Sequence, residues 1–123
     1  MTEGTSAVKA RVEAQLEAVM EMPKQMAAYE RQLEKARRES GGLDKSAIRG
    51  WEEAMGAELR RIMKARAAAY ALLQSLDNEV RAVFVGRYLN GLTWEAIAEA
   101  HAMSLATVYR VRARGLLRLA AQG

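Results

Sequence analysis

The stretch LDNEVRAVFVGRYLNGLTWEAIAEAHAMSLATVYRVRARGLLRL, residues 76–119, predicts three helices in the carboxyl-terminal part of the chain. Its first helix is expected over residues 78–89. Asp77 is a suitable N-cap, and Asn90-Gly91 is a suitable stop, because glycine readily adopts the left-handed conformation found at helix ends. Apolar residues at helical spacing predict the buried side of this helix, namely Val80, Val83, Phe84, Tyr88 and Leu89.

Two more helices are expected after this stop. Thr93 is predicted to cap a short helix over residues 94–101, with Ile97 and Ala98 pointing inward. Ala102-Met103 then forms a tight connection, in which Ala102 stands where glycine would fit more easily. Ser104 is predicted to cap a final helix over residues 105–120, whose apolar side carries Val108, Val111, Leu116 and Leu119. Two helices joined in this way predict a helix-turn-helix.

The distribution of charge singles out the final helix. From Ser104 onward the chain has four arginines and no acidic residue, whereas residues 77–103 have two arginines and four acidic residues. The second helix of a helix-turn-helix protrudes and can enter a DNA major groove. The basic charge on this predicted recognition helix therefore indicates an anionic partner.

Residues 76–119 resemble region 4 of bacterial sigma factors. The likeness is carried by RYLNG, by TWEAIA and by SLATVYR, in the order and spacing of that family's helix-turn-helix. The resemblance implies binding of double-stranded, promoter-like DNA and contact with RNA polymerase. A helical leader ahead of such a module is also similar to small transcriptional regulators encoded by phages and prophages.

The resemblance implies roles for residues of the final helix. Ser104 and Thr107 would touch phosphate, Leu105, Ala106, Tyr109 and Arg110 would face the groove, and Arg114 would lie near the backbone. Arg110 is predicted to contact a base, with guanine as the expected one. Arg112, Arg114 and Arg118 are predicted to make phosphate contacts or salt bridges. Tyr109 could equally pack against the short helix, and Trp94 is expected to brace the first two helices. The resulting set of DNA-binding residues is Ser104, Leu105, Ala106, Thr107, Tyr109, Arg110, Arg112, Arg114 and Arg118.

The leader predicts two long helices. Residues 6–39 carry an apolar stripe at Val8, Val12, Leu16, Val19, Met26 and Leu33. Pro23 is expected to kink or restart this helix near residues 22–24. Ser40-Gly41-Gly42 predicts a stop and a turn, and Asp44 predicts a new N-cap. The second helix is expected to reach Gln74, with a stripe at Ile48, Met55, Ile62, Ala69 and Leu76 that Leu59 and Leu73 widen.

These two stripes predict an antiparallel, coiled-coil-like hairpin. The stripes are poor in bulky side chains, so a second copy or another protein is expected to cover the remaining apolar face, and a homo-oligomer is predicted. Trp51 is predicted either to anchor such an interface or to pack within the hairpin. The fold prediction is thus all-α, with residues 1–76 as a hairpin for oligomerisation or partner binding and residues 77–123 as the DNA-binding domain.

Composition excludes several other functions. The 123-residue chain has a formal net charge of +4, no cysteine and one histidine, so a zinc ribbon, a thiol nucleophile and a multi-histidine metal site are excluded. No pair of nucleophile and base can be assembled, so an enzyme is not expected, and neither a cofactor nor a metal is predicted. Without a secretion signal or a membrane span in the sequence, a cytoplasmic location is expected.

Three functions remain open at this point. The favoured one is a sequence-specific transcriptional regulator of phage or prophage origin that reads the major groove with residues 105–120. The second is a module that docks on RNA polymerase or another factor without reading DNA, as the apolar Leu105 and Ala106 would suggest. The third is a small phage DNA-packaging (terminase small) subunit.

Overall fold

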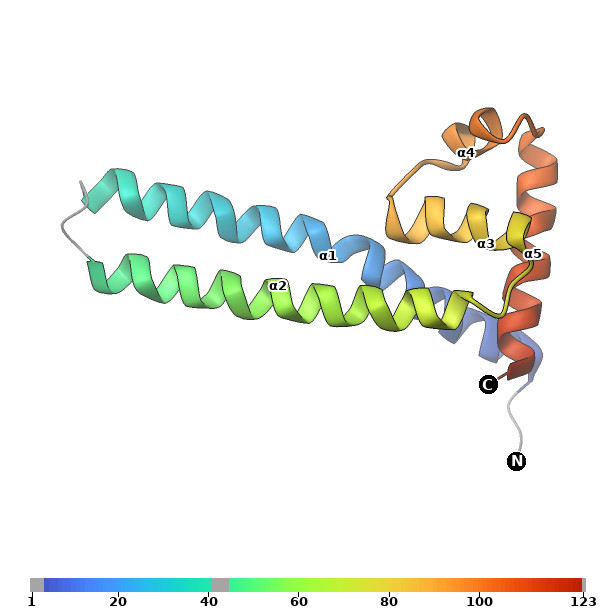
Figure 1. Cartoon of the computed structure of the whole chain (residues 1–123), viewed down its shortest axis with the longest axis horizontal. Helices are drawn as coiled ribbons and strands as arrows, with labels where there is room; N and C mark the ends of the chain where they lie inside the picture. The colour runs from blue at the N-terminus through green and yellow to red at the C-terminus, as the bar shows by residue number, and fades with distance from the viewer. Residues whose placement is uncertain (1–3, 41–44, 123) are drawn as a thin grey trace. The chain divides into compact units, whose positions relative to one another are not determined.

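The computed structural model describes residues 4–40 and 45–122, and all of its regular elements within these ranges are helical (Figure 1). The predicted turn at Gly41-Gly42 and the predicted cap at Asp44 lie outside the described residues. The elements are α1 (Thr5–Ser40), α2 (Lys45–Leu73), α3 (Asn78–Phe84), the π-helical turn η1 (Val85–Leu89), α4 (Trp94–Ala100) and α5 (Leu105–Gln122). The predicted all-α order, a long packed pair followed by a helix-turn-helix, is confirmed. None of the helices in the described ranges is long and apolar enough to cross a membrane.

The contacts of the chain divide it into two compact units. The first, called the head unit here, combines Met1–Met20 with Arg66–Gly123, and the second, called the arm unit, is Glu21–Ala65. The predicted boundary between residues 76 and 77 divides the chain into two consecutive segments, whereas the head unit combines two segments that are distant in the sequence. The beginning of α1 and the end of α2 pack with the three short helices, and they contribute Val12, Leu16, Ala69 and Leu73 to the head-unit core.

The arm unit is held by contacts between its two helical segments. Leu33 and Ile62 are buried, and Arg37 Nη2 lies 3.1 Å from Glu52 Oε1. The rings of Tyr29 and Trp51 meet edge to face with their centroids 6.1 Å apart. Trp51 therefore packs within the helical pair, as one of its two predictions stated.

Two expectations for the long helices are corrected. Of the two alternatives expected at Pro23, a kink or a restart, the restart does not occur, because α1 is continuous with the proline inside it. Leu59 does not widen the buried stripe, because 46% of it is exposed. Glu58, only 5% exposed, is the residue buried beside Ile62, and its carboxylate pairs with Arg61 at 3.0 Å.

The helix predicted over residues 78–89 divides into α3 and η1. At its C-terminal end the Asn90 amide donates to the Val85 carbonyl at 3.0 Å, and Gly91 follows with a φ of +69°. Gly91 thus provides the left-handed residue that the sequence predicted. Asp77 occupies the predicted N-cap position, but its side chain makes no capping hydrogen bond within the described part of the chain.

Candidate nucleic-acid interface

A tight turn joins α4 to α5 and sets the helix-turn-helix geometry. Thr93 Oγ1 accepts a hydrogen bond from the Ala96 amide at 3.0 Å, so the predicted cap of α4 is confirmed. Ala102 has a φ of +52°, which an L-residue adopts at a cost. The Met103 amide closes the turn by donating to the Ala98 carbonyl at 2.8 Å.

The crossing of α3 and α5 depends on the absence of a side chain at Gly115. A Cβ atom there would lie 2.3 Å from Phe84 Cε1 and 2.9 Å from Val80 Cγ1. The two helices therefore approach at backbone distance, and the buried side of α5 is clamped onto α3. As predicted, that side consists of Val108, Val111, Leu116 and Leu119.

The opposite side of α5 is exposed. Ala106, Arg110, Ala113 and Leu117 follow one another at helical spacing on this side, and all four are exposed. Leu117 is 52% exposed. We call these four residues the outward face. Of the predicted DNA-binding residues, Ser104, Ala106, Tyr109, Arg110, Arg114 and Arg118 are exposed, whereas Leu105, Thr107 and Arg112 are half-buried.

A chain of hydrogen bonds runs along the first two turns of α5. Ser104 Oγ accepts from the Thr107 amide at 3.1 Å, which confirms the predicted cap. The two hydroxyl oxygens of Ser104 and Thr107 lie 2.8 Å apart, and Arg110 Nη2 donates to Thr107 Oγ1 at 3.0 Å. The structure therefore joins three of the predicted site residues directly.

Arg112 is separated from the other arginines of α5. Its guanidinium is hydrogen-bonded and ion-paired to Glu13 of α1 and lies 5.8 Å from the centre of the Trp94 ring. Burial alone would lower the pKa of Arg112, but the hydrogen bond and charge of Glu13, together with the smaller effects of Tyr88, outweigh burial and raise it. Of the two roles predicted for Arg112, the structure shows the salt bridge.

Trp94 links the short helices, as expected. Its ring centre lies 6.1 Å from that of Tyr88 and 6.0 Å from that of Tyr109, and the Arg87 guanidinium carbon sits 4.9 Å from it. Tyr109 packs on Trp94 and is still 43% exposed. Packing and an outward contact are therefore compatible for this side chain.

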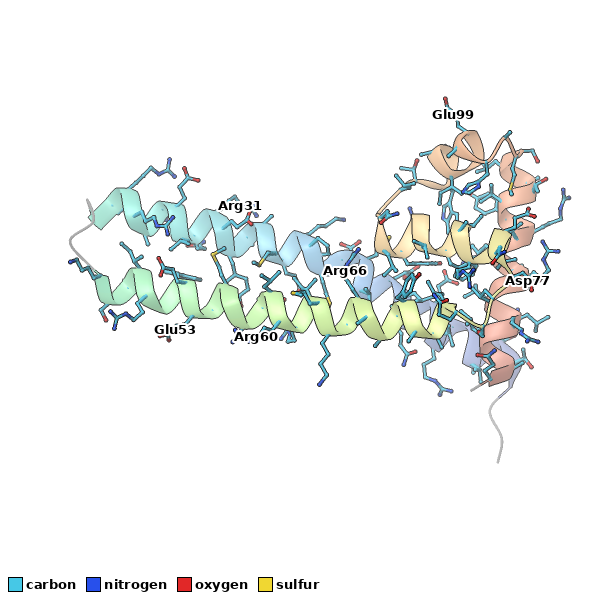
Figure 2. All side chains as sticks on the ribbon, viewed as in Figure 1. Arg31, Glu53, Arg60, Arg66, Asp77 and Glu99 are labelled. Carbon is cyan, nitrogen blue, oxygen red and sulfur yellow. The ribbon has the colours of Figure 1, made fainter. Side chains whose placement is uncertain are left out.

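Arg114 and Arg118 border a hollow of about 210 Å³ beside the α2–α3 connection. Ser75, Leu76, Asp77, Val80 and Gly115 complete its lining. Within residues 4–40 and 45–122, no carboxylate lies within ion-pair distance of Arg110, Arg114 or Arg118. Asp77 lines the same hollow without an ion pair to either arginine, and Glu99 points outward from α4 (Figure 2).

Sequence reasoning missed two residues that hold this site in place. Glu13 neutralises Arg112 from 99 positions away. Arg66 of α2 donates to the Leu89 carbonyl at 2.6 Å, and thereby supports the π-helical turn (Figure 2). Neither residue carries a local signal, because each pairs with a group that is distant in the sequence.

Residues 66–119 match the family model described as Sigma-70, region 4. These residues form a Sigma-70 region 4 domain. The match begins at Arg66, the residue where the second segment of the head unit also begins. Region 4 is a non-catalytic, DNA-binding helix-turn-helix domain, in agreement with the resemblance found in the sequence. Comparison with curated proteins gives no match, and comparison with solved structures gives none either.

Proposed function

We propose that this protein is a sequence-specific, DNA-binding transcriptional regulator that reads the major groove with α5. The observation that carries the proposal is the exposure of Arg110, Arg114 and Arg118 on the recognition helix of a region 4 domain, with no carboxylate of the described residues pairing with them. Arg110 is exposed on the outward face, and we assign it the contact with a base. Arg114 and Arg118 lie to one side, where they contact phosphate. Such a protein acts in the cytoplasm, where bacterial DNA lies.

Salt dependence of binding to duplex DNA tests this proposal. Each phosphate contact lowers log affinity by about 0.9 per log unit of salt, so the two phosphate contacts proposed for Arg114 and Arg118 predict a slope of roughly −2 per protomer. Arg118→Ala should reduce the slope by about 0.9. Arg31→Ala is the matched control, because Arg31 is exposed on α1 in the arm unit (Figure 2). A slope near zero, or equal effects of the two variants, would contradict the proposal.

A second candidate, docking on RNA polymerase without reading DNA, is supported by the exposed apolar surface of α5. Leu117 and Ala106 lie on the outward face, and neither can make a hydrogen bond to a base. Co-purification with RNA polymerase that Leu117→Ser abolishes, with no shift of duplex DNA, would select this candidate. A DNA shift that survives Leu117→Ser would select the regulator.

We also propose that the arm unit mediates homo-oligomerisation. Leu59 and Met63, one turn apart on α2, are 46% and 61% exposed. Two adjacent large apolar side chains on one helix are a common feature of helix–helix contacts. Light scattering tests this: a dimer supports the regulator, a ring-sized assembly favours the packaging subunit, and a monomer contradicts oligomerisation. A phage or prophage origin rests on the pattern of the leader and stays a prediction.

A further inference from the structure

The outward face of α5 presents one group of hydrogen-bond donors between small side chains. Ala106 lies one turn before Arg110 and Ala113 lies one turn after it, and both are exposed. Alanine can contact a thymine methyl group but offers no side-chain donor or acceptor to a base. Any hydrogen-bonded reading of a base from this face therefore depends on the Arg110 guanidinium.

That guanidinium is hydrogen-bonded to a neighbouring side chain of the same helix. Thr107 Oγ1 accepts a hydrogen bond from Arg110 Nη2 at 3.0 Å, and the Thr107 hydroxyl is itself bonded to Ser104 Oγ at 2.8 Å. The Ser104 side chain is held in turn by the Thr107 amide at 3.1 Å. Three side chains spaced by three residues thus lie on one side of α5, and each fixes the next.

We propose that Thr107 is a positioning residue that holds the Arg110 guanidinium in the orientation that reads a guanine. The inference rests on the DNA-binding function proposed above. A guanidinium has five N–H donors, and the bond to Thr107 uses one of them. Enough donors remain for a bidentate contact with the O6 and N7 atoms of guanine. Because the side chain is ordered before DNA arrives, less conformational entropy is lost on binding.

Such a guanidinium predicts a specific base preference for the DNA site. One G·C pair dominates recognition, and the neighbouring pairs that face Ala106 and Ala113 are thymine-rich and weakly read. Replacement of the dominant guanine by adenine should lower affinity of the wild-type protein about 5- to 140-fold, the range for one bidentate contact. Loss of the ordering by Thr107 should remove about 2- to 10-fold of this discrimination.

The experiment uses the full chain and the duplex most enriched by it from a random 20-base-pair library. Affinities are measured for this duplex and for copies in which each guanine in turn is replaced by adenine or by 7-deazaguanine, which lacks the N7 acceptor. The proteins are the wild type, Thr107→Val, Thr107→Ser, Arg110→Ala and the double variant Arg110→Ala with Thr107→Val. Valine keeps the shape of threonine without its hydroxyl, and serine keeps the hydroxyl. Thermal unfolding of each variant is followed in parallel.

We expect one guanine whose replacement lowers the affinity of the wild type and of Thr107→Ser strongly, and lowers the affinity of Thr107→Val less. In the Arg110→Ala background, Thr107→Val should change nothing further at this guanine, because the two residues act as one unit. An equal loss on every duplex, also in the Arg110→Ala background, would show that Thr107 contacts phosphate and would overturn the inference. A lower melting temperature with unchanged discrimination would overturn it too. If the wild type enriches no duplex at all, the proposed function itself fails.

Discussion

Gly115 of α5 lies so close to Phe84 of α3 that a methyl group does not fit between them. An added Cβ atom would be 2.3 Å from Cε1 and 2.5 Å from Cζ of the phenylalanine ring. Phe84 is fully buried, so its ring has no free space to move into. Glycine lowers helix propensity, yet at this position it sets the distance at which the recognition helix is held.

We therefore expect Gly115→Ala to destabilise the head unit. Overpacking a core costs about 1–3 kcal/mol, and the roughly 1 kcal/mol that alanine contributes over glycine inside a helix offsets only part of that cost. A net loss of up to about 2 kcal/mol in the free energy of unfolding is predicted, and urea denaturation measures it.

Gly50→Ala is the matched control for this change. Gly50 is exposed inside α2, and nothing lies within 4 Å of an added Cβ atom there. The same substitution should therefore stabilise the protein by up to about 1 kcal/mol. Equal effects of the two substitutions would show that the contact with Phe84 is not the cause.

The short helices of the head unit were predictable because their signals are local. Thr93, Ser104 and Gly91 each act within a few residues, through a cap or a left-handed φ. The apolar spacing of α5 likewise named its buried side correctly, since one face of a helix recurs at a fixed interval. The exposed side, which carries most of the candidate site residues, follows by elimination.

Two features could not be predicted from the sequence: the pairing of Arg112 with Glu13, and the choice of the buried face of α2. No sequence pattern pairs Glu13 with Arg112 across 99 positions, so the neutralisation of one arginine of α5 was not foreseen. The apolar spacing predicts an inward Leu59, whereas Glu58 is the buried residue of that turn. A helix with many alanines offers two similar apolar faces, and the partner helix decides which of them is covered.

The pair of Glu13 and Arg112 should stabilise the head unit measurably. Their side chains are only 25% and 29% exposed, so Glu13→Gln leaves a largely buried guanidinium without its counter-charge. We expect a loss of about 1–2 kcal/mol in the free energy of unfolding, after allowance for solvent screening. Chemical denaturation followed by circular dichroism measures this loss.

Glu30→Gln serves as the control for Glu13→Gln, since Glu30 is exposed on the same helix. It should change the unfolding free energy by less than about 0.5 kcal/mol. If Glu13→Gln is equally neutral, the contact of α1 with Arg112 does not hold the helix-turn-helix together.

Replacement of Ala102 by glycine should stabilise the protein. Its φ of +52° costs an L-residue about 1–2 kcal/mol, and glycine removes this cost. Part of the gain is offset because glycine makes the unfolded chain more flexible and so loses more conformational entropy on folding. Ala102→Gly should therefore raise the unfolding free energy by about 0.5–1 kcal/mol. Gly91→Ala, at a φ of +69°, should lower it by about 1 kcal/mol. A lower melting temperature for Ala102→Gly would contradict the strain at this turn.

Alkaline pH should destabilise the head unit through Tyr88. Burial, and then the charge of Glu13, raise the pKa of its hydroxyl above the usual 10.0. Between 10.0 and this higher value the unfolded chain has released the proton and the folded protein has not, so stability falls as pH rises. Tyr88→Phe should flatten the decline above pH 10, whereas Tyr70→Phe, at a residue 52% exposed, should leave it unchanged. Urea denaturation from pH 8 to about 11 tests this, and parallel declines of Tyr88→Phe and the wild type would show that the Tyr88 hydroxyl is not responsible.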